Sequence, residues 1–207
     1  MLAKDFRENA RKKLAGKWGT MALIALIEGL IMGALSITLF GDILIGGPIA
    51  LGIAGCSLSV ARGCDVKLED MFDGFSNFVS AFVLAFTNGL LIFLWSLLLI
   101  VPGIIKSYSY SMSKYILKDN PQMTANQARK ASMQMMNGNK WRLFCLHFSF
   151  IGWILLSGLT LGILLLWVLP YMRVAEAEFY ENLKASNPIE TQKPEKVKAE
   201  DVEIKEN

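Results

Sequence analysis

Four residues with polar side chains stand within or directly beside long apolar stretches of the sequence: Glu28, Asn88, Lys106 and His147. An ionisable or strongly polar side chain is costly in hydrocarbon, so each of them is a candidate functional residue. A carboxyl, an amide and an imidazole gathered inside a helical bundle could bind a proton, a cation or a polar headgroup. We therefore treat the four residues as a candidate intramembrane polar site.

The spacing of the apolar stretches places Glu28 and Asn88 at equivalent positions. Three times an aromatic residue precedes a glycine by eleven positions, in the pairs Trp18/Gly29, Phe78/Gly89 and Trp141/Gly152. Glu28 and Asn88 each come directly before such a glycine, so we expect them to share one depth and to form a hydrogen bond with Glu28 neutral. This pair would join two helices structurally. A ligand or proton site that includes His147 is the alternative.

Lys106 lies four residues after Pro102 on the most polar of the six predicted helices, and Ser107, Tyr108, Ser109, Tyr110, Ser111 and Ser113 follow it. Such a segment is expected to line the bundle interior or a wet cavity, unless Lys106 extends to the outer headgroups. On the last predicted helix, Arg173 lies close in sequence to Glu176 and Glu178, and this spacing predicts a local ion pair.

Signatures of an enzyme are missing from the sequence. It has one histidine and contains neither G-x-S-x-G nor H-E-x-x-H. Cys145 and His147 lie two positions apart, on different faces of a helix, so they do not form a nucleophile–base pair. The three cysteines fit neither a disulfide framework nor a metal site. We expect no catalytic residues, no metal and no cofactor.

The composition predicts an all-α integral membrane protein. The 207 residues are 53% hydrophobic and 19% charged, which is more apolar surface than a soluble domain can easily cover. Three runs, Thr20–Phe40, Val79–Ile105 and Leu143–Met172, contain no Asp, Glu, Lys or Arg except Glu28. Each exceeds the roughly 20 residues that a helix needs to cross a bilayer.

The aromatic–glycine units recur together with a serine and a proline, which predicts one structural unit used three times. The fold expected is six transmembrane helices arranged as three repeated helical hairpins, each preceded by a cytoplasmic amphipathic segment. The predicted helices are 18–40, 45–62, 78–100, 102–118, 141–158 and 168–183. The predicted transmembrane bundle is 1–183, with repeats over about 1–63, 64–119 and 120–183. The rest, 184–207, reads as a disordered cytoplasmic tail.

Proline and small residues mark further features of the predicted helices. Pro48, Pro102 and Pro170 are expected in the first turn of the three return helices, where a missing N–H costs nothing. The stretch 157–169 could form an extra outer helix or a re-entrant turn. Small residues four positions apart, such as Gly29/Gly33 and Gly52/Cys56, predict close helix packing.

Three amphipathic segments precede the hairpins. Their apolar residues recur at helical spacing: Leu2, Phe6, Ala10 and Leu14, then Leu68, Met71, Phe72, Phe75 and Val79, then Ala125, Ala128, Ser132, Met135 and Met136. Thr124 and Gln127 form a capping-box pattern, and Gly138 is a stop signal. We expect these segments to lie in the headgroup interface, although plain cytoplasmic linkers are an alternative.

Basic residues cluster on one predicted side of the membrane. Residues 1–18 carry six Lys or Arg and residues 114–142 carry six more, whereas the predicted outer segments carry none. The positive-inside rule therefore places both termini in the cytoplasm. The pairs Lys17–Trp18 and Lys140–Trp141 are expected to be interface anchors. Basic clusters beside membrane spans suit anionic lipid headgroups, so we expect no nucleic-acid partner.

Several motifs together resemble the domain-of-unknown-function 975 family of bacterial integral membrane proteins. They are Gly46-Gly47-Pro48, Ala61-Arg62-Gly63, the run from Leu94 to Lys106 (LWSLLLIVPGIIK), Lys140-Trp141, Ser149-Phe150-Ile151-Gly152-Trp153 and Thr160-Leu161-Gly162. The resemblance covers about 5–182. It implies a multi-span protein of the bacterial cytoplasmic membrane, and it supplies no activity and no catalytic residues.

Two classes of function remain open at this point. The first is a non-catalytic membrane protein that binds lipids, a membrane-protein partner or a second copy of itself. The second is a small permease or lipid-handling protein with a polar interior around Glu28. Hairpins without broken helices lack the usual transporter signature, and this favours the first class.

Overall fold

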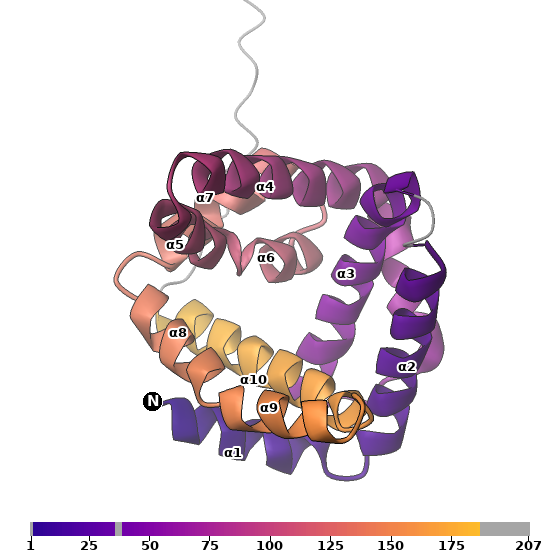
Figure 1. The fold of residues 1–207 in the computed structure, drawn as a ribbon. Coiled ribbons are helices and arrows are strands. Elements are labelled where there is room, and N and C mark those ends of the chain that lie inside the picture. The colour runs from indigo at the N-terminus through magenta and orange to yellow at the C-terminus, as the bar shows by residue number, and fades with distance from the viewer. Residues whose placement is uncertain (1, 36–38, 187–207) are drawn as a thin grey trace, which may run out of the picture.

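The structure, a computed structural model, describes residues 2–35 and 39–186, and this part of the chain is helical and contains no strand (Figure 1). The helices are α1 (Ala3–Leu14), α2 (Trp18–Leu35), α3 (Leu39–Ala61), the 3₁₀ helix η1 (Leu68–Asn77), α4 (Phe78–Leu98), α5 (Ile100–Tyr110), α6 (Ser113–Asp119), α7 (Ala125–Met135), α8 (Lys140–Phe148), α9 (Ile151–Leu159) and α10 (Leu165–Ser186). The predicted all-helical class is confirmed.

Four stretches are long and apolar enough to cross a membrane: Trp18–Leu35, Leu44–Ala61, Leu68–Leu97 and Lys140–Leu159. The two other predicted spans, 102–118 and 168–183, are not among them. The first is divided between α5 and α6, and the second carries several charged residues within α10.

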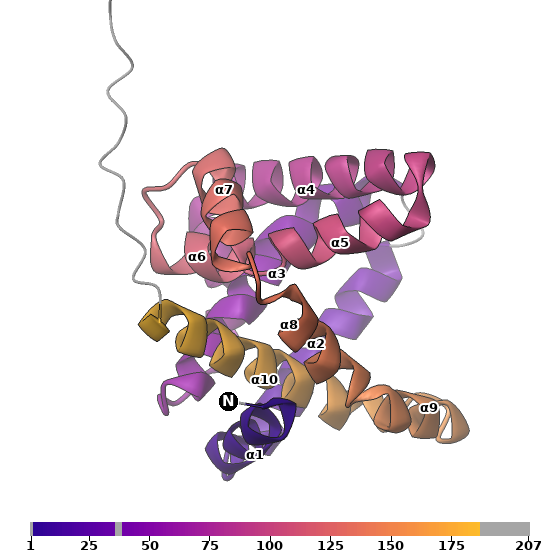
Figure 2. The same ribbon diagram turned by 90° about the vertical axis from the view of Figure 1, so that its left-hand side faces the viewer.

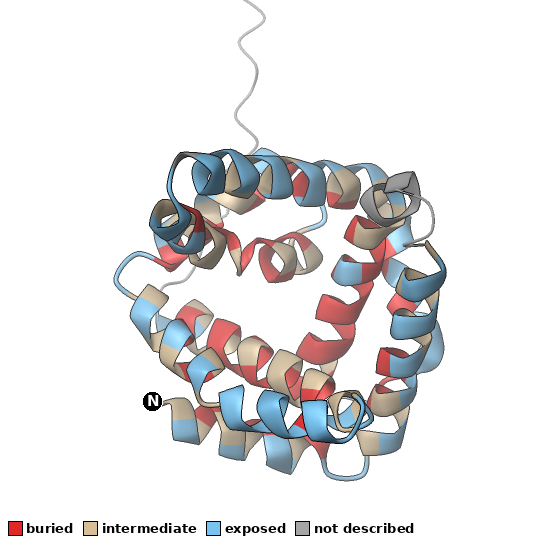
Figure 3. Cartoon of the chain, in the orientation of Figure 1, coloured by how far each residue is buried: buried red, intermediate tan, exposed pale blue. Residues whose placement is uncertain are grey.

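Helix α3 is the centre of the bundle. Within its apolar stretch 72% of the residues are buried, against 17%, 11% and 22% in the other three stretches. It contacts η1, α4, α10, α6 and α2, and Figure 3 shows it mostly buried while α2, α4 and α9 are largely exposed. The outer helices therefore surround a central one.

The outer helices present a broad apolar surface. Leu30 is 65% exposed on α2, Leu97 is 75% exposed on α4 and Leu159 is 82% exposed on α9. Soluble monomers rarely expose contiguous apolar surface of this extent. The surface is compatible with insertion of these helices into a membrane.

The ends of the helices gather at two opposite ends of the molecule (Figure 2). The corner between α4 and α5 and the turn between α9 and α10 lie on the right-hand side of that view. The connection between α6 and α7 and the C-terminal end of α10 lie on the left. Helices α4 and α5 pack against each other as an antiparallel pair.

Serine hydroxyl groups accompany the breaks between helices. Ser111 and Ser113 donate to the backbone carbonyl oxygens of Tyr108 and Tyr110, where α5 gives way to α6. Ser149 donates to Leu146 O at the break between α8 and α9. A hydroxyl that bonds the carbonyl three residues earlier competes with the regular helical ladder. The expected continuous helices 102–118 and 141–158 are each split at these places.

Two of the three proline expectations are wrong. Pro102 is the third residue of α5, but Pro48 and Pro170 lie inside α3 and α10, beyond their first turns. Both helices begin earlier than expected, at Leu39 and Leu165, and each loses one backbone hydrogen bond at its proline. In 157–169 the chain forms a turn with positive φ at Leu161 and Gly162 rather than an extra helix.

The amphipathic segments form helices, but their apolar residues face the protein. On α1, Phe6, Ala10 and Leu14 are buried, and the ring of Phe6 meets that of Phe179 on α10 edge-on at 5.3 Å. Helix α7 begins at the predicted Thr124 capping box and buries Ala128. Only η1 keeps its aromatic residues largely exposed. The apolar faces of α1 and α7 are thus buried against other helices of the protein, whereas the headgroup interface was expected to bury them.

The predicted tail overlaps the last helix slightly. Helix α10 continues to Ser186, so 184–186 are helical, and Lys184 within it donates to Asp119 at 2.5 Å. The remainder of the tail, 187–207, lies outside the described residues, as do 36–38.

Glycine permits a direct backbone contact between α3 and η1. A Cβ atom added at Gly52 would lie 1.8 Å from Met71 O, and one added at Gly74 would lie 1.9 Å from Pro48 O. At Gly29, by contrast, an added Cβ would meet no heavy atom within 4 Å among the described residues. The small-residue packing expected from sequence therefore occurs at Gly52 but not at Gly29.

We predict that Gly52→Ala destabilises the bundle by about 2–3 kcal/mol, because the new methyl group must displace the backbone of η1. The matched control, Gly89→Ala, adds a methyl group to a helix in open space and should be neutral or slightly stabilising. Denaturant unfolding of the purified variants measures both. Equal stability of the two variants would contradict the close contact.

Candidate functional site

Helix α10 takes part in most of the ion pairs that join different helices of the bundle. Five of its charged residues pair with partners in four other parts of the chain: Arg173 with Glu28 on α2, Glu176 with Lys114 on α6, Glu178 with Lys13 on α1, Glu181 with Arg62 after α3, and Lys184 with Asp119 on α6. A charge removed from water is tolerated when it is paired and hydrogen-bonded. Helix α10 is therefore linked by ion pairs to α1, α2, α6 and the end of α3.

Glu28 forms a bidentate ion pair with Arg173. The Nη1 and Nη2 atoms of Arg173 donate to Oε2 and Oε1 of Glu28 at 2.5 and 2.7 Å, and the side chains are 24% and 18% exposed. The expected hydrogen bond between Glu28 and Asn88 is wrong, as is the expected local pairing of Arg173. A guanidinium that fits both oxygens of a carboxylate binds it more strongly than one amide can.

Glu176 is the centre of a second cluster, which contains His147. The Nε2 atom of His147 lies 2.7 Å from Oε1 of Glu176, and Nδ1 lies 3.3 Å from the hydroxyl of Tyr108. The other carboxylate oxygen accepts from Tyr115 at 3.1 Å and from Lys114 at 3.3 Å. The imidazole is thus held between a carboxylate and a phenol, and it does not contact Glu28 or Asn88.

The four predicted site residues are divided among separate places. Asn88 donates through Nδ2 to Ser113 Oγ at 3.0 Å and lines a cavity of about 270 Å³. Glu28 lines a smaller cavity of about 60 Å³. Lys114 and Ala50 line both cavities. Lys106 lies outside them, with its Nζ 5.1 Å from the ring centre of Trp95.

A third cluster joins the ends of α6 and α10. The Asp119 carboxylate accepts from Arg62 Nη2 at 2.7 and 2.8 Å, from Lys184 Nζ at 2.5 Å and from the hydroxyl of Tyr180 at 3.0 Å. Burial alone would raise the pKa of Asp119. The hydrogen bonds from Lys184 and Arg62 outweigh burial and hold this pKa below its ordinary value. The carboxylate is consequently charged at neutral pH and fastens two helices.

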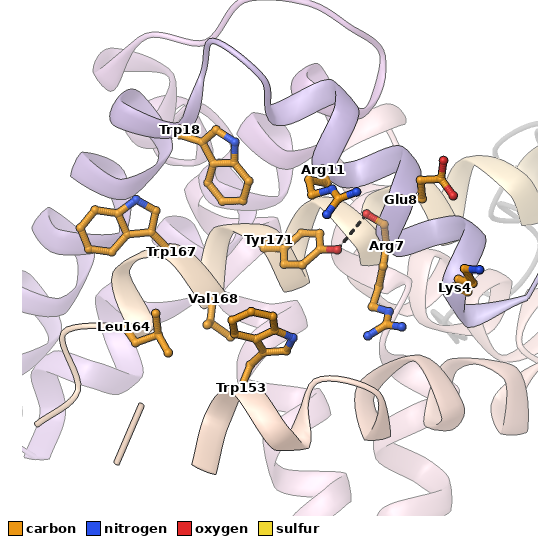
Figure 4. Close-up of a pocket in the computed structure, with 10 residues that line it drawn as sticks. All are labelled: Lys4, Arg7, Glu8, Arg11, Trp18, Trp153, Leu164, Trp167, Val168 and Tyr171. Carbon is orange, nitrogen blue, oxygen red and sulfur yellow. Dashed lines mark hydrogen bonds between the residues drawn. The ribbon is translucent and has the colours of Figure 1, made fainter. Parts of the chain in front are cut away.

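A groove of about 630 Å³ lies between α1, α9 and α10, beside the start of α2 (Figure 4). Its lining residues are Lys4, Arg7, Glu8, Arg11, Trp18, Trp153, Leu164, Trp167, Val168 and Tyr171. The basic side chains of α1 gather at one end of the groove, and the tryptophans and aliphatic side chains line the rest. The groove is therefore amphiphilic along its length.

Arg7 and Tyr171 are fixed where the two parts of the groove meet. The Tyr171 hydroxyl donates to the backbone oxygen of Arg7 at 3.0 Å, and its ring meets Trp18 and Phe150 edge-on. Arg7 donates through Nη1 to Ser149 O at 3.2 Å. Its Nε atom is buried and has no hydrogen-bond partner among the described residues. A donor is thus left for an additional acceptor at this place.

The expected interface anchors differ in their surroundings. Lys17 is largely covered and donates to Gly63 O and Cys64 O at 2.9 and 2.5 Å, so it fastens α2 to the end of α3. Trp18 lines the groove. Trp141 is 71% exposed at the start of α8, directly after Lys140. Only Trp141 has the exposure that an anchor in the membrane interface requires.

Sequence reasoning missed the groove and its residues. Arg7, Trp153 and Trp167 lie in three different helices, and the tertiary fold alone brings them together. The available signal was the concentration of tryptophan in the third apolar run together with the basic face of α1. Within the described residues, no group of three or more His, Cys, Asp and Glu side chains is placed to hold a metal ion.

Comparison with known proteins gives a family of undefined activity. The family model described as "Protein of unknown function (DUF975)" matches residues 97–187, which include α5 to α10. The resemblance expected from the sequence is confirmed over this part of the chain. No curated protein and no solved structure matches the chain.

We predict that Glu28→Gln destabilises the protein by about 2–3 kcal/mol, because it leaves the guanidinium of Arg173 without its counter-charge. The double variant Glu28→Leu/Arg173→Leu should recover most of this loss, because it removes both charges. Unfolding of the purified variants in detergent measures the effect. The control is Glu8→Gln, which removes an exposed pair with Lys12 and should cost less than about 0.5 kcal/mol. Parent-like stability of Glu28→Gln would contradict the pairing.

Proposed function

We propose, with the family resemblance as premise, that this chain is a non-catalytic, multi-pass protein of the bacterial cytoplasmic membrane that binds an anionic amphiphile in its groove. The ligand class is a lipid with a negatively charged headgroup. The observation that carries the proposal is the arrangement of charge and apolar surface in one groove: basic side chains at one end, tryptophan and aliphatic side chains along the rest.

The polar end of the groove has the charge to hold an anionic headgroup. Lys4, Arg7 and Arg11 face it together with one acid, Glu8, which leaves a local excess of two positive charges. Arg7 also has a buried Nε atom without a hydrogen-bond partner among the described residues. Arginine is well suited to phosphate, because its planar fork donates to two oxygens at once.

The apolar part has the size and chemistry to hold an acyl chain. A volume of about 630 Å³ lies within the range of roughly 300–1,000 Å³ that is usual for small-molecule sites. Trp153, Trp167 and Val168 line it, and Trp18 stands near its polar end. Tryptophan beside a cationic cluster is typical of the level at which lipid headgroups meet chains.

The membrane arrangement that we propose contains six crossings in three repeated hairpins, with both termini cytoplasmic. Helices α5–α6 and α10 would return the chain even though they are not among the four apolar spans. Support comes from the antiparallel packing of α4 and α5 and from the opposite ends at which the connections gather. The basic residues of α1 and α7 would then lie on the cytoplasmic side. Binding of a membrane-protein partner, or of a second copy of this chain, stays a prediction.

This topology predicts opposite labelling of two single cysteines in a background without Cys56, Cys64 and Cys145. Lys130→Cys on α7 should react with a membrane-impermeant maleimide only after the cells are opened. Ile163→Cys, in the exposed turn before α10, should react in intact cells. Labelling of residue 130 in intact cells would contradict the proposed orientation.

Lipid binding predicts selective quenching of the groove tryptophans. With Trp95 and Trp141 replaced by Phe, the three remaining tryptophans all line the groove. Brominated phosphatidylglycerol should quench their fluorescence at lower mole fraction than brominated phosphatidylcholine. The double variant Arg7→Gln/Arg11→Gln should weaken this preference by about 2 kcal/mol, roughly thirtyfold, since each basic residue near an anionic surface contributes about 1 kcal/mol.

The matched control is Lys12→Gln, which removes an exposed positive charge from α1 outside the groove. It should keep most of the lipid preference. Equal effects of Lys12→Gln and Arg11→Gln would mean that the helix attracts anionic membranes as a whole, and the proposed groove site would then be wrong.

A further inference from the structure

We infer that the cavity beside Asn88 binds a small zwitterionic solute of the amino-acid class. Its carboxylate would be held by Lys114, and its ammonium group by the amide oxygen of Asn88. This inference does not depend on the groove, because the cavity lies between α3, α4, α5, α6 and α10 and shares no lining residue with the groove.

The cavity has one apolar wall and one polar wall. Its volume is about 270 Å³. Small and aliphatic residues of α3 and α4 form the first wall: Gly47, Ala50, Leu51, Ala81, Leu84, Ala85 and Ile92. The second wall consists of Asn88, Ser107, Tyr110, Ser111, Ser113, Lys114 and Glu176. Such a cavity suits a small solute with several polar groups and a short apolar part.

The polar wall is built around the break between α5 and α6. Ser111, at this break, lines the cavity, and Ser107 and Ser113 line it from the flanking helices. Interrupted helices are tolerated at membrane depth where they line a cavity or a binding site, and they are typical of transporter sites. The expectation of continuous helices in every hairpin favoured a binding protein over a permease. The break between α5 and α6 removes that argument against a permease.

Asn88 presents an unsatisfied acceptor. Its Nδ2 atom donates to Ser113 Oγ, and Ser113 Oγ donates in turn to Tyr110 O at 2.6 Å, so this chain of hydrogen bonds fixes the amide. The Oδ1 atom is buried and has no partner among the described residues. A buried acceptor without a donor is unfavourable, and an ammonium group of a ligand would supply the missing donor.

Lys114 presents unused donors. Among the described contacts, its ammonium group donates to Glu176 at 3.3 Å and lies 5.0 Å from the ring centre of Tyr115. A lysine ammonium has three N–H donors. Two of them are therefore available for a carboxylate of the ligand, whereas Glu176 is already engaged by Tyr115 and His147.

The charges around the cavity favour a ligand without net charge. Lys114 and Arg173 balance Glu28 and Glu176, and His147 is held against the Glu176 carboxylate. A simple anion or cation would upset this balance in a poorly solvated place, which is costly. A zwitterion places opposite charges beside the opposite partners. Ala50, the exposed residue within the otherwise buried 47–58 of α3, shows that the cavity is reachable.

Equilibrium binding of tritiated alanine, serine, leucine and glutamine to the purified full-length protein in detergent tests the inference. At least one amino acid should bind saturably. Lys114→Met should weaken that binding at least tenfold, and Ala50→Leu should abolish it by filling the cavity. Ala50→Leu should keep the parent unfolding temperature, because it adds only apolar volume to an open space. Lys106→Met, outside the cavity, is the matched control and should bind as the parent does.

The outcomes separate the inference from its competitors. Propionate and ethylamine, which carry only one of the two charges, should compete at least tenfold less well than the bound amino acid. Absence of saturable binding by the parent would mean that the cavity holds water only, and it would overturn the inference. So would binding that survives Ala50→Leu, or competition by propionate equal to that of the amino acid.

Discussion

The interior of this bundle depends on the pairing of the charges on α10. Glu28, Lys114, Lys13, Arg62 and Asp119 reach it from α2, α6, α1 and the end of α3. Together the pairs favour one position of α10 along its axis and one rotation, because a shift of one residue would leave several charges unpaired, among them the largely buried Glu28 and Glu176. Breaking one buried pair costs more than the pair itself contributes, since the remaining charge lacks compensation. The apolar contacts then fill the space that the pairs define, with α3 in the centre and the other apolar helices outside.

Local signals in the sequence predicted many of the elements. The apolar runs gave the helical class, and the Thr124 cap predicted the start of α7 correctly. The breaks beside Ser111 and Ser149 were not predicted, because a serine in an apolar helix is compatible with both a continuous and an interrupted ladder. The partner surface of the amphipathic segments was also ambiguous. A stripe such as Phe6, Ala10 and Leu14 suits a membrane and a protein equally, and only the tertiary fold decides between them.

The candidate site likewise depends on tertiary contacts that local sequence signals do not reveal. Glu28 was recognised by its residue type and depth, but its partner Arg173 lies 145 residues away, and nothing local in either segment indicates the match. A hydrogen bond between Asn88 and Glu28 was expected because the two residues occupy equivalent repeat positions. Repeat position does not give the rotation of each helix about its axis, and this rotation decides which side chains meet. The groove was missed because its walls come from four helices, and because Trp153 and Trp167 look like ordinary membrane tryptophans until Arg7 is placed beside them.

The polarity of α10 has a consequence for the biogenesis of the protein. In the proposed arrangement this helix would leave the ribosome after the helices with which it pairs, yet it is too polar to partition into lipid alone, because charged groups at the centre of a helix oppose insertion. Helix α10 can enter the membrane only where Glu28, Lys114 and Asp119, on helices that precede it in the chain, are already in place to pair with its charges. Insertion of α10 and assembly of the bundle are then one step. A chain that stops before α10 would leave Glu28 and Lys114 without their partners Arg173 and Glu176. Unpaired charges of this kind are a pattern that membrane quality-control proteases could recognise as an unfinished protein.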